Sequence, residues 1–149
     1  MANPELLEMW IEIAEKDLLS AKKLLLPPDP QFENALYHCQ QCAEKATKAL
    51  ILLNGESPPR THDITQLINI LSEYYVGLNI FLINNKSNLI TEFGVRFRYP
   101  TYPKASDKPL TEAYVADLIG DAENFFTQAK EQVNHYVSQS RHQDYPTEK

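Results

Sequence analysis

The stretch that most constrains the fold is residues 29–63, DPQFENALYHCQQCAEKATKALILLNGESPPRTHD. The pattern predicts one long helix over residues 30–53, then a Pro-Pro turn and the start of another helix. Asp29 can cap the long helix, with a proline at the first helical position, where its missing N–H costs nothing. Asn54-Gly55 supplies a left-handed stop. A helix of this extent is about 35 Å long, so a single element spans the whole of a small domain.

The two faces of this predicted helix differ in kind when its residues are placed at 100° intervals. One face is apolar and consists mostly of small side chains: Ala35, Cys39, Cys42, Ala43, Ala46, Ala49, Leu50 and Leu53. Another helix can approach such a face closely, so we expect this helix to be a central packing element. The opposite face carries polar residues in single file, at i, i+4, i+7 and i+11: Tyr37, Gln41, Glu44 and Lys48.

The polar file has two interpretations. It can be a solvated face with an ordinary Glu44–Lys48 pair at i, i+4, which is worth a few tenths of a kcal/mol. A wholly exposed face is harder to arrange on a central helix, however. The file can equally line a groove or a dimer seam, or hydrogen-bond to the last helix.

Length and composition bound the class of protein. The 149 residues, 43% of them hydrophobic and 23% charged, fit one globular domain with a real core. We expect this core over residues 5–137 and a frayed tail over residues 138–149. The apolar runs are too short to cross a bilayer and the N-terminus does not resemble a signal peptide, so a cytoplasmic location is expected.

The charge distribution limits the partners. A formal net charge of −6 argues against nucleic-acid binding by the surface as a whole. Residues 86–108 differ from the rest, because five basic and four aromatic residues lie there beside two acidic ones. This stretch is a local basic, aromatic region on an otherwise acidic protein.

The rest of the chain also has helical periodicity. A first helix begins after Asn3 as its cap and ends before a Pro-Pro pair. A third begins near Asp63, with Thr61 as an alternative cap. A fourth lies within residues 80–97, and a last helix follows Thr111. The sequence therefore predicts an all-α fold, an up-and-down bundle of four to five helices.

The only two cysteines, Cys39 and Cys42, form a CxxC motif inside the long helix. A redox-active CxxC lies at a helix N-terminus after a strand, where the helix dipole lowers the thiol pKa. A zinc site needs two more ligands, for which only His38 and His62 are candidates. We therefore expect two small buried thiols and no metal.

Three segments together resemble the HEPN domain family. The run ALYHCQQCAEKATKALILLNG is followed by THDITQLINIL and later by RYP, so that the resemblance covers residues 5–137. In that family a helix with a Gln…Glu-Lys…Lys pattern precedes a His-Asp turn, and Arg-Tyr-Pro closes the fourth helix. The resemblance implies a small, often dimeric helical domain. Such a domain either partners a minimal nucleotidyltransferase or acts as a ribonuclease.

The ribonuclease motif of the family is incomplete here. HEPN ribonucleases resemble one another in an Arg followed by four to six residues and then a His. The Arg stabilises phosphate charge and the His exchanges a proton with an RNA hydroxyl, without metal. The matching arginine is Arg98, but the positions for the histidine hold Pro103, Lys104 and Ala105. His62 is the candidate for a displaced histidine.

Three functions of different classes follow from these features. The first is a non-catalytic HEPN-type binding module that works with a minimal nucleotidyltransferase in a toxin–antitoxin-like pair and binds nucleotide. The second is a dimeric, metal-independent HEPN ribonuclease, a toxin that acts on RNA through a displaced histidine. The third is a structural or regulatory helical dimer. A homodimer is expected from the family and from tyrosines at positions 37, 99 and 102, and neither a cofactor nor a membrane is expected.

The predicted ligand or partner site is a cleft along the polar file. Its members are Tyr37, Gln41, Glu44, Lys45 and Lys48 of the long helix, closed by His62, Arg98 and Tyr99. Arg98 supplies a planar, always charged fork suited to phosphate or carboxylate, and Tyr99 a face for stacking. In the alternative interpretation Arg98 pairs with a helix carboxylate such as Glu44 and only fixes the fourth helix.

Overall fold

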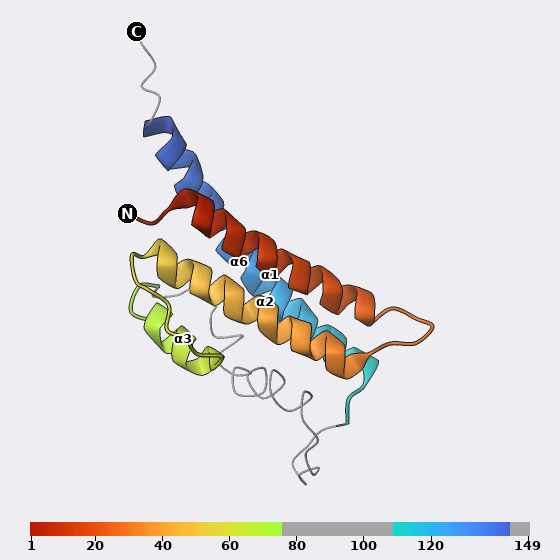
Figure 1. Cartoon of the computed structure of the whole chain (residues 1–149). Coiled ribbons are helices and arrows are strands. Elements are labelled where there is room, and N and C mark those ends of the chain that lie inside the picture. Colours follow the sequence, from red (N-terminus) through yellow and green to blue (C-terminus); the bar gives the residue numbers. More distant parts are fainter. Residues whose placement is uncertain (76–108, 144–149) are drawn as a thin grey trace.

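A computed structural model describes residues 1–75 and 109–143, and in these ranges the regular structure is entirely helical (Figure 1). The helices are α1 (Pro4–Leu24), α2 (Phe32–Leu53), α3 (Ile64–Leu71) and α6 (Glu112–Gln143). The all-α prediction is confirmed. The fourth helix expected within residues 80–97 lies outside the described residues, as do Arg98 and Tyr99.

The three long helices, α1, α2 and α6, pack against one another in a bundle. Figure 1 shows α1 and α2 side by side with α6 against both, and α3 on the other side of α2. Ion pairs show that α6 runs antiparallel to α1, because Lys22 near the end of α1 pairs with Glu123 near the start of α6. At the opposite end Glu8 pairs with Arg141. Since α2 contacts all three other helices, its predicted central position is confirmed.

The core confirms the predicted apolar face of α2 except at Leu53, which is half-buried. Four alanines of α2, at positions 35, 43, 46 and 49, are fully buried, and so are both cysteines or nearly so. The buried positions of α1 include Leu7, Ile11 and Leu18, four and seven residues apart, which places them on one side of the helix. Aromatic bulk comes from α6, where Phe125 and Phe126 are buried. Small side chains on α2 therefore let three helices approach it closely.

The caps of α1 and α3 are as predicted. Asn3 Oδ1 accepts hydrogen bonds from the backbone N–H groups of Glu5 and Leu6, at 2.9 and 3.3 Å. Asp63 caps α3 in the same way, because its Oδ1 accepts hydrogen bonds from the backbone N–H groups of Thr65 and Gln66 at 2.9 and 3.3 Å. The alternative cap Thr61 instead accepts from the Asp63 N–H. Each side chain satisfies helix donors that would otherwise be unpaired.

The predicted start of α2 is wrong by two residues. The helix begins at Phe32, and Gln31 occupies the cap position without a side-chain hydrogen bond. The Gln31 N–H donates to the Leu24 carbonyl at 2.7 Å, which ties the chain to the end of α1 before it turns into α2. Asp29, the predicted cap, accepts from the Gln31 side chain instead. The predicted stop is confirmed, because Gly55 has a φ of +85°.

Helix α6 is longer than predicted. We expected fraying from residue 138, but the helix continues to Gln143 and its end projects beyond α1 in Figure 1. Val137 is buried, and Arg141 reaches the Glu8 carboxylate at 2.9 Å. The Tyr136 hydroxyl also donates to the Ala2 carbonyl at 2.9 Å. These contacts with the N-terminal part of the chain stabilise the last turns of α6, whose polar composition alone predicts fraying. None of the helices in the described ranges combines the length and apolarity needed to span a bilayer.

Candidate functional site

A charged cluster lies on α2 where the chain enters α3. We call Gln40, Glu44, Lys48 and His62 the Glu44 cluster. Lys48 Nζ donates to Glu44 Oε1 at 2.8 Å, and Gln40 Nε2 donates to Glu44 Oε2 at 2.9 Å. His62 Nδ1 lies 3.1 Å from both carboxylate oxygens. One carboxylate thus collects three partners from two segments of the chain.

The Glu44 cluster is buried except at one end. The side chains of Glu44 and Lys48 are 5% and 11% exposed, whereas that of His62 is 77% exposed. Burial raises the pKa of Glu44, but hydrogen bonds from Lys48, Gln40 and His62 outweigh it, so the pKa lies below its usual value. Glu44 is therefore ionised at neutral pH. Such a buried charge is tolerated only when its hydrogen-bonding positions are filled, as they are here.

The ionised carboxylate fixes the orientation and tautomer of His62. A carboxylate only accepts, so Nδ1 must carry the proton that lies between His62 and Glu44. The ring is held by this contact, and Gln40 Nε2 also reaches the His62 backbone carbonyl at 3.4 Å. Nε2 is left on the exposed part of the ring, as an acceptor in neutral His62 or a donor in the protonated form. A carboxylate-oriented imidazole of this kind can accept or deliver a proton, or bind an anion.

A second cluster joins α1 to α2. We call Asp17, His38 and Lys45 the Asp17 cluster. Asp17 belongs to α1, is 8% exposed, and its two oxygens contact His38 Nδ1 at 2.8 Å and Lys45 Nζ at 2.5 Å. Tyr37 packs edge-on against the His38 ring, with centroids 5.4 Å apart. The cluster compensates one buried carboxylate with two groups from the neighbouring helix.

The predicted cleft residues divide between the two clusters. Glu44, Lys48 and His62 meet in the Glu44 cluster, and Gln41 joins it through a 2.6 Å hydrogen bond to Gln40. Lys45 belongs to the Asp17 cluster instead, with Tyr37 beside it. Arg98 and Tyr99 lie outside the described residues. The ordinary surface pair considered for Glu44 and Lys48 is wrong, because both side chains are buried.

Three cluster residues had no place in the predicted site. Asp17 lies three residues after Ala14 and four before Ala21, so it occupies the apolar stripe of α1, which predicts a paired buried carboxylate. Gln40 precedes Glu44 by four residues, the spacing of a helix-face hydrogen bond. His38 was considered only as a zinc ligand. The signal for Gln40 lay within α2 itself, whereas the pairing of Asp17 with His38 could be seen only once α1 and α2 were placed side by side.

The thiols behave as expected for structural cysteines. Burial raises the pKa of Cys39 to about 12, with a smaller contribution from Asp121, and burial also raises that of Cys42. The Cys39 thiol donates to the Leu118 carbonyl at 3.6 Å. Within residues 1–75 and 109–143 no group of three or more His, Cys, Asp or Glu side chains is placed to hold a metal ion. Neither thiol has the thiolate character that redox chemistry needs.

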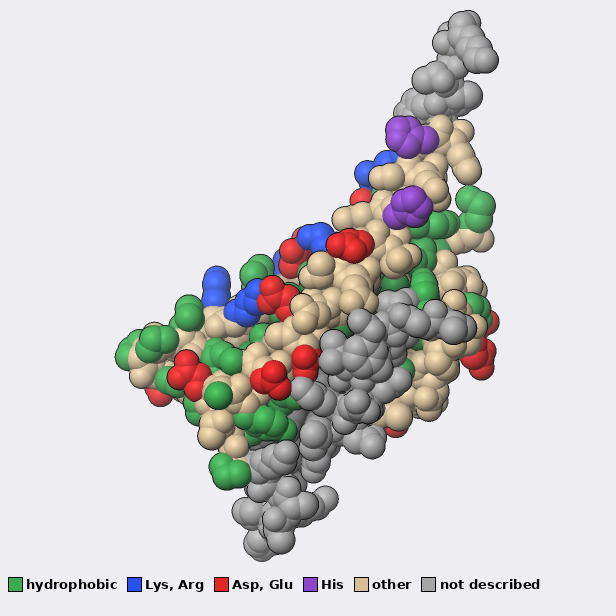
Figure 2. All heavy atoms as spheres, turned by 180° about the vertical axis from the view of Figure 1, so that it is seen from behind, with side chains coloured by type: hydrophobic (Ala, Val, Ile, Leu, Met, Phe, Trp, Pro, Cys, Tyr) green, Lys and Arg blue, Asp and Glu red, His purple; other side chains and the backbone are tan. Residues whose placement is uncertain are grey.

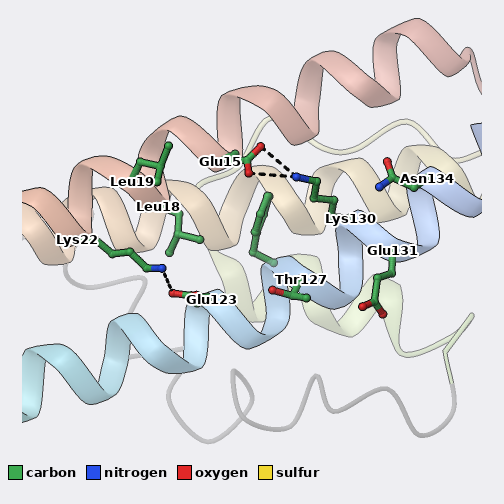
Figure 3. A pocket seen from close by; sticks show the side chains of 10 residues that line it. Glu15, Leu18, Leu19, Lys22, Glu123, Thr127, Lys130, Glu131 and Asn134 are labelled. Carbon is green, nitrogen blue, oxygen red and sulfur yellow. Dashed lines mark hydrogen bonds and ion pairs between the residues drawn. The ribbon is translucent and has the colours of Figure 1, made fainter.

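A shallow groove of about 410 Å³ runs between α1 and α6 (Figure 3). Two ion pairs cross it, Lys22 with Glu123 and Glu15 with Lys130, the latter at 3.1 Å. Together with the Glu8–Arg141 pair they form what we call the α1–α6 ladder. Figure 2 shows the molecule from behind, with basic and acidic side chains adjacent along its upper edge. Five charged side chains line the groove, and four of them neutralise one another in the two pairs that cross it; Glu131 is the fifth.

Comparisons with known proteins place the chain and its fold in a family. A single bundle of helices around a polar-faced α2 defines a small helical domain, and the family model of the HEPN domain matches residues 7–132. The chain belongs to the HEPN domain family. The crystal structure of ST0689, an archaeal HEPN homologue, matches it with a TM-score of 0.63 and 26% identity. That match covers 85% of this chain and 97% of the other.

A curated relative shares a shorter segment. The protein described as "Putative toxin MJ1304", from Methanocaldococcus jannaschii, is 43% identical over 53 residues. The matched segment is 36% of this chain and 34% of that protein, so this chain spans about a third of the relative's length.

Proposed function

We propose that this chain is a non-catalytic HEPN-type binding module that works with a minimal nucleotidyltransferase in a toxin–antitoxin-like pair, binds nucleotide and acts as a homodimer. The observation that carries the proposal is the Glu44 cluster, a buried ionised carboxylate that presents one exposed, oriented imidazole. Membership of the HEPN family and the similarity to a protein named as a toxin support the toxin–antitoxin-like part of the proposal. The sequence supports the non-catalytic role, because no histidine follows Arg98 at the family spacing.

The Glu44 cluster suits binding because it is pre-organised. Holding His62 against a carboxylate that Lys48 and Gln40 already fix means that little side-chain freedom is lost when a ligand binds. The Nε2 edge of His62 can donate to a phosphate oxygen when the ring is protonated, or accept from a donor when it is neutral. A nucleotide, or the nucleotidyltransferase that carries it, supplies groups of both kinds.

The proposal is tested with His62→Ala. Because the His62 side chain is largely exposed, we expect its removal to weaken binding to the co-expressed nucleotidyltransferase or to ATP by about tenfold, with the melting temperature lowered by no more than a few degrees. Affinity is measured by calorimetry, and stability by thermal unfolding. His135→Ala is the matched control, since His135 is an exposed histidine of α6 outside both clusters. Equal affinities of wild type, H62A and H135A would show that the Glu44 cluster is purely structural.

A second candidate is the metal-independent ribonuclease, which the orientation of His62 favours. A histidine whose Nδ1 contacts a carboxylate and whose Nε2 edge is exposed has the arrangement of a general acid or base. On the first proposal, the purified dimer leaves single-stranded RNA uncleaved in the presence of a metal chelator. Cleavage that disappears in both His62→Ala and Arg98→Ala, but persists in His135→Ala, would establish the ribonuclease and refute the non-catalytic role.

A further inference from the structure

Gln41 is the outermost member of a hydrogen-bond chain that begins at the carboxylate of the Glu44 cluster. Its Nε2 donates to Gln40 Oε1 at 2.6 Å, and Gln40 Nε2 in turn donates to Glu44 Oε2 at 2.9 Å. Gln40 is fully buried, whereas Gln41 is half-buried. We call Gln40 and Gln41 the amide pair. Through the amide pair, the buried charge of Glu44 acts on a side chain nearer the surface.

Glu44 determines which way round both amides lie. A primary amide has a donor at one end and an acceptor at the other, so an isolated glutamine can turn over and offer either. The ionised carboxylate only accepts, so Gln40 must present its Nε2 to Glu44 and its Oε1 to Gln41. Gln41 must then present its own Nε2 to Gln40. Turning either amide over would bring two acceptors together, with no hydrogen bond between them.

The other end of the Gln41 amide is available to a ligand. Within residues 1–75 and 109–143, the hydrogen bond to Gln40 is the only one that the Gln41 side chain makes. Every buried side-chain nitrogen and oxygen in these ranges has a partner, so Gln41 Oε1 must reach the surface. Gln41 therefore presents a fixed acceptor, with the second N–H of its Nε2 beside it. Because the amide pair already holds this orientation, little side-chain freedom is lost when a ligand binds.

We propose that Gln41 recognises the base of the bound nucleotide and selects adenine over purines that carry an oxygen at position 6. The inference rests on the nucleotide binding in the proposed function and names its specificity. Adenine has an amino donor at position 6 next to a ring-nitrogen acceptor, the pattern to which a glutamine amide hydrogen-bonds. Gln41 Oε1 accepts from the amino group, and its second N–H donates to the ring nitrogen.

The amide pair turns this match into discrimination. Guanine and hypoxanthine carry an oxygen at position 6, so the same edge of these bases sets an acceptor against Gln41 Oε1. An unrestrained glutamine would turn over to meet them, but here that turn would set the Oε1 atoms of Gln40 and Gln41 against each other. Adenine is therefore favoured by a hydrogen bond, and the other two bases are disfavoured by the cost of breaking the amide pair.

Gln41 is near enough to His62 for one nucleotide to contact both. Gln40 Nε2 also donates to the His62 backbone carbonyl at 3.4 Å, so Gln40 is hydrogen-bonded to both residues. With ordinary bond and hydrogen-bond lengths, Gln41 Oε1 lies on the order of 10 Å or less from that carbonyl. The base at Gln41 and the phosphates at the Nε2 edge of His62 therefore share one site, whose two ends recognise different parts of the ligand.

The test compares ATP with inosine triphosphate (ITP), whose base has an oxygen in place of the amino group. We expect the full wild-type chain to bind ATP about tenfold more tightly than ITP in calorimetry. Gln41→Met keeps the length of the side chain but removes the amide, and lowers the ATP affinity to the ITP level. Gln132→Met, at an exposed glutamine of α6 outside both clusters, is the matched control and keeps the preference. Thermal unfolding checks that each variant is folded.

Two further variants separate base recognition from phosphate binding. His62→Ala weakens the binding of ATP and ITP alike and leaves the ratio of their affinities unchanged, because it acts at the phosphate end. Glu44→Gln keeps the shape of the carboxylate but lets position 44 donate as well as accept, so both members of the amide pair can turn over. The preference for ATP then falls, although Gln41 itself is intact.

The outcomes distinguish this inference from the proposed function. Equal affinities of wild type for ATP and ITP would overturn base recognition while leaving nucleotide binding in place. A preference that survives Gln41→Met, or an equal loss of both affinities in that variant, would mean that Gln41 is only a structural link. Binding of neither nucleotide by wild type would refute the nucleotide binding of the proposed function itself, and base recognition with it.

Discussion

The Glu44 cluster and the α1–α6 ladder are built from the same chemical groups in opposite surroundings. Glu44 and Lys48 are 5% and 11% exposed, whereas Glu15 and Lys130 are 42% and 39% exposed at a similar separation. The buried carboxylate has three partners, whereas the Glu15 carboxylate is paired with Lys130 and stays 42% exposed. An exposed ion pair can open because water solvates both charges. A buried ion has no water, so protein groups must occupy its hydrogen-bonding positions, as they do around Glu44.

The difference extends to what each region can do. An exposed pair can open and reform at little cost, so the ladder can align two helices but cannot hold a side chain rigidly. The Glu44 cluster fixes its members, and among the described residues no buried side-chain nitrogen or oxygen lacks a partner. Orientation of His62 is a property that only the buried region can provide.

Removing the carboxylate of the Glu44 cluster should have the largest effect on the free energy of unfolding. Glu44→Ala leaves the Lys48 ammonium buried without its carboxylate, and we expect a loss of about 3 kcal/mol in the free energy of unfolding. For a chain of this length that lowers the melting temperature by about 10 °C. The measurement is urea or thermal unfolding at neutral pH. The double variant Glu44→Leu with Lys48→Met removes both charges, and should recover most of the loss.

Acid weakens the same region by protonating Glu44. Its pKa in the folded protein lies below the ordinary value of 4.5, so its contribution to stability is fully present above that pH. The contribution is lost as the pH falls through the folded pKa. The melting temperatures of wild type and Glu44→Gln should therefore differ at pH 6 and converge as the pH falls through the lowered folded pKa of Glu44. A difference that stays constant across this range would mean that Glu44 is not ionised in the fold.

Removing a charge from the exposed α1–α6 ladder should change the free energy of unfolding least. Glu15→Gln removes one ladder pair and is expected to lower the free energy of unfolding by less than about 1 kcal/mol. Because salt screens exposed charges, the difference from wild type disappears at high salt concentration. The Glu44→Ala effect persists under the same conditions. A salt-resistant loss in Glu15→Gln would show that the two regions are more alike than their exposures indicate.

The fold was largely predictable because its signals are local. The spacing of apolar residues on α1 and α2, the caps Asn3 and Asp63, and the left-handed Gly55 each act within a few residues. The errors arose where distant contacts decide. The Gln31 N–H donates to the Leu24 carbonyl before α2 begins, and the last turns of α6 follow the burial of Val137 in the core.

The candidate site was only partly predictable for the same reason. Helical spacing placed Gln41, Glu44 and Lys48 on one face, but it could not say which would be buried. Lys45 is adjacent to Glu44 in sequence, yet it faces α1 and pairs with Asp17. Helical spacing tells in which direction around the helix axis each side chain of α2 points. Whether that side chain is buried depends on which other helix packs on that side.

The alanines on α2 also limit how this protein can change over time. Each buried alanine marks a place where another helix lies so close that an added methyl group would force backbones apart. The polar side of α2 is equally constrained, because its charges depend on one another. Mutational drift should therefore accumulate on the solvent-facing turns of α6, leaving α2 as the part of the sequence by which distant descendants remain recognisable.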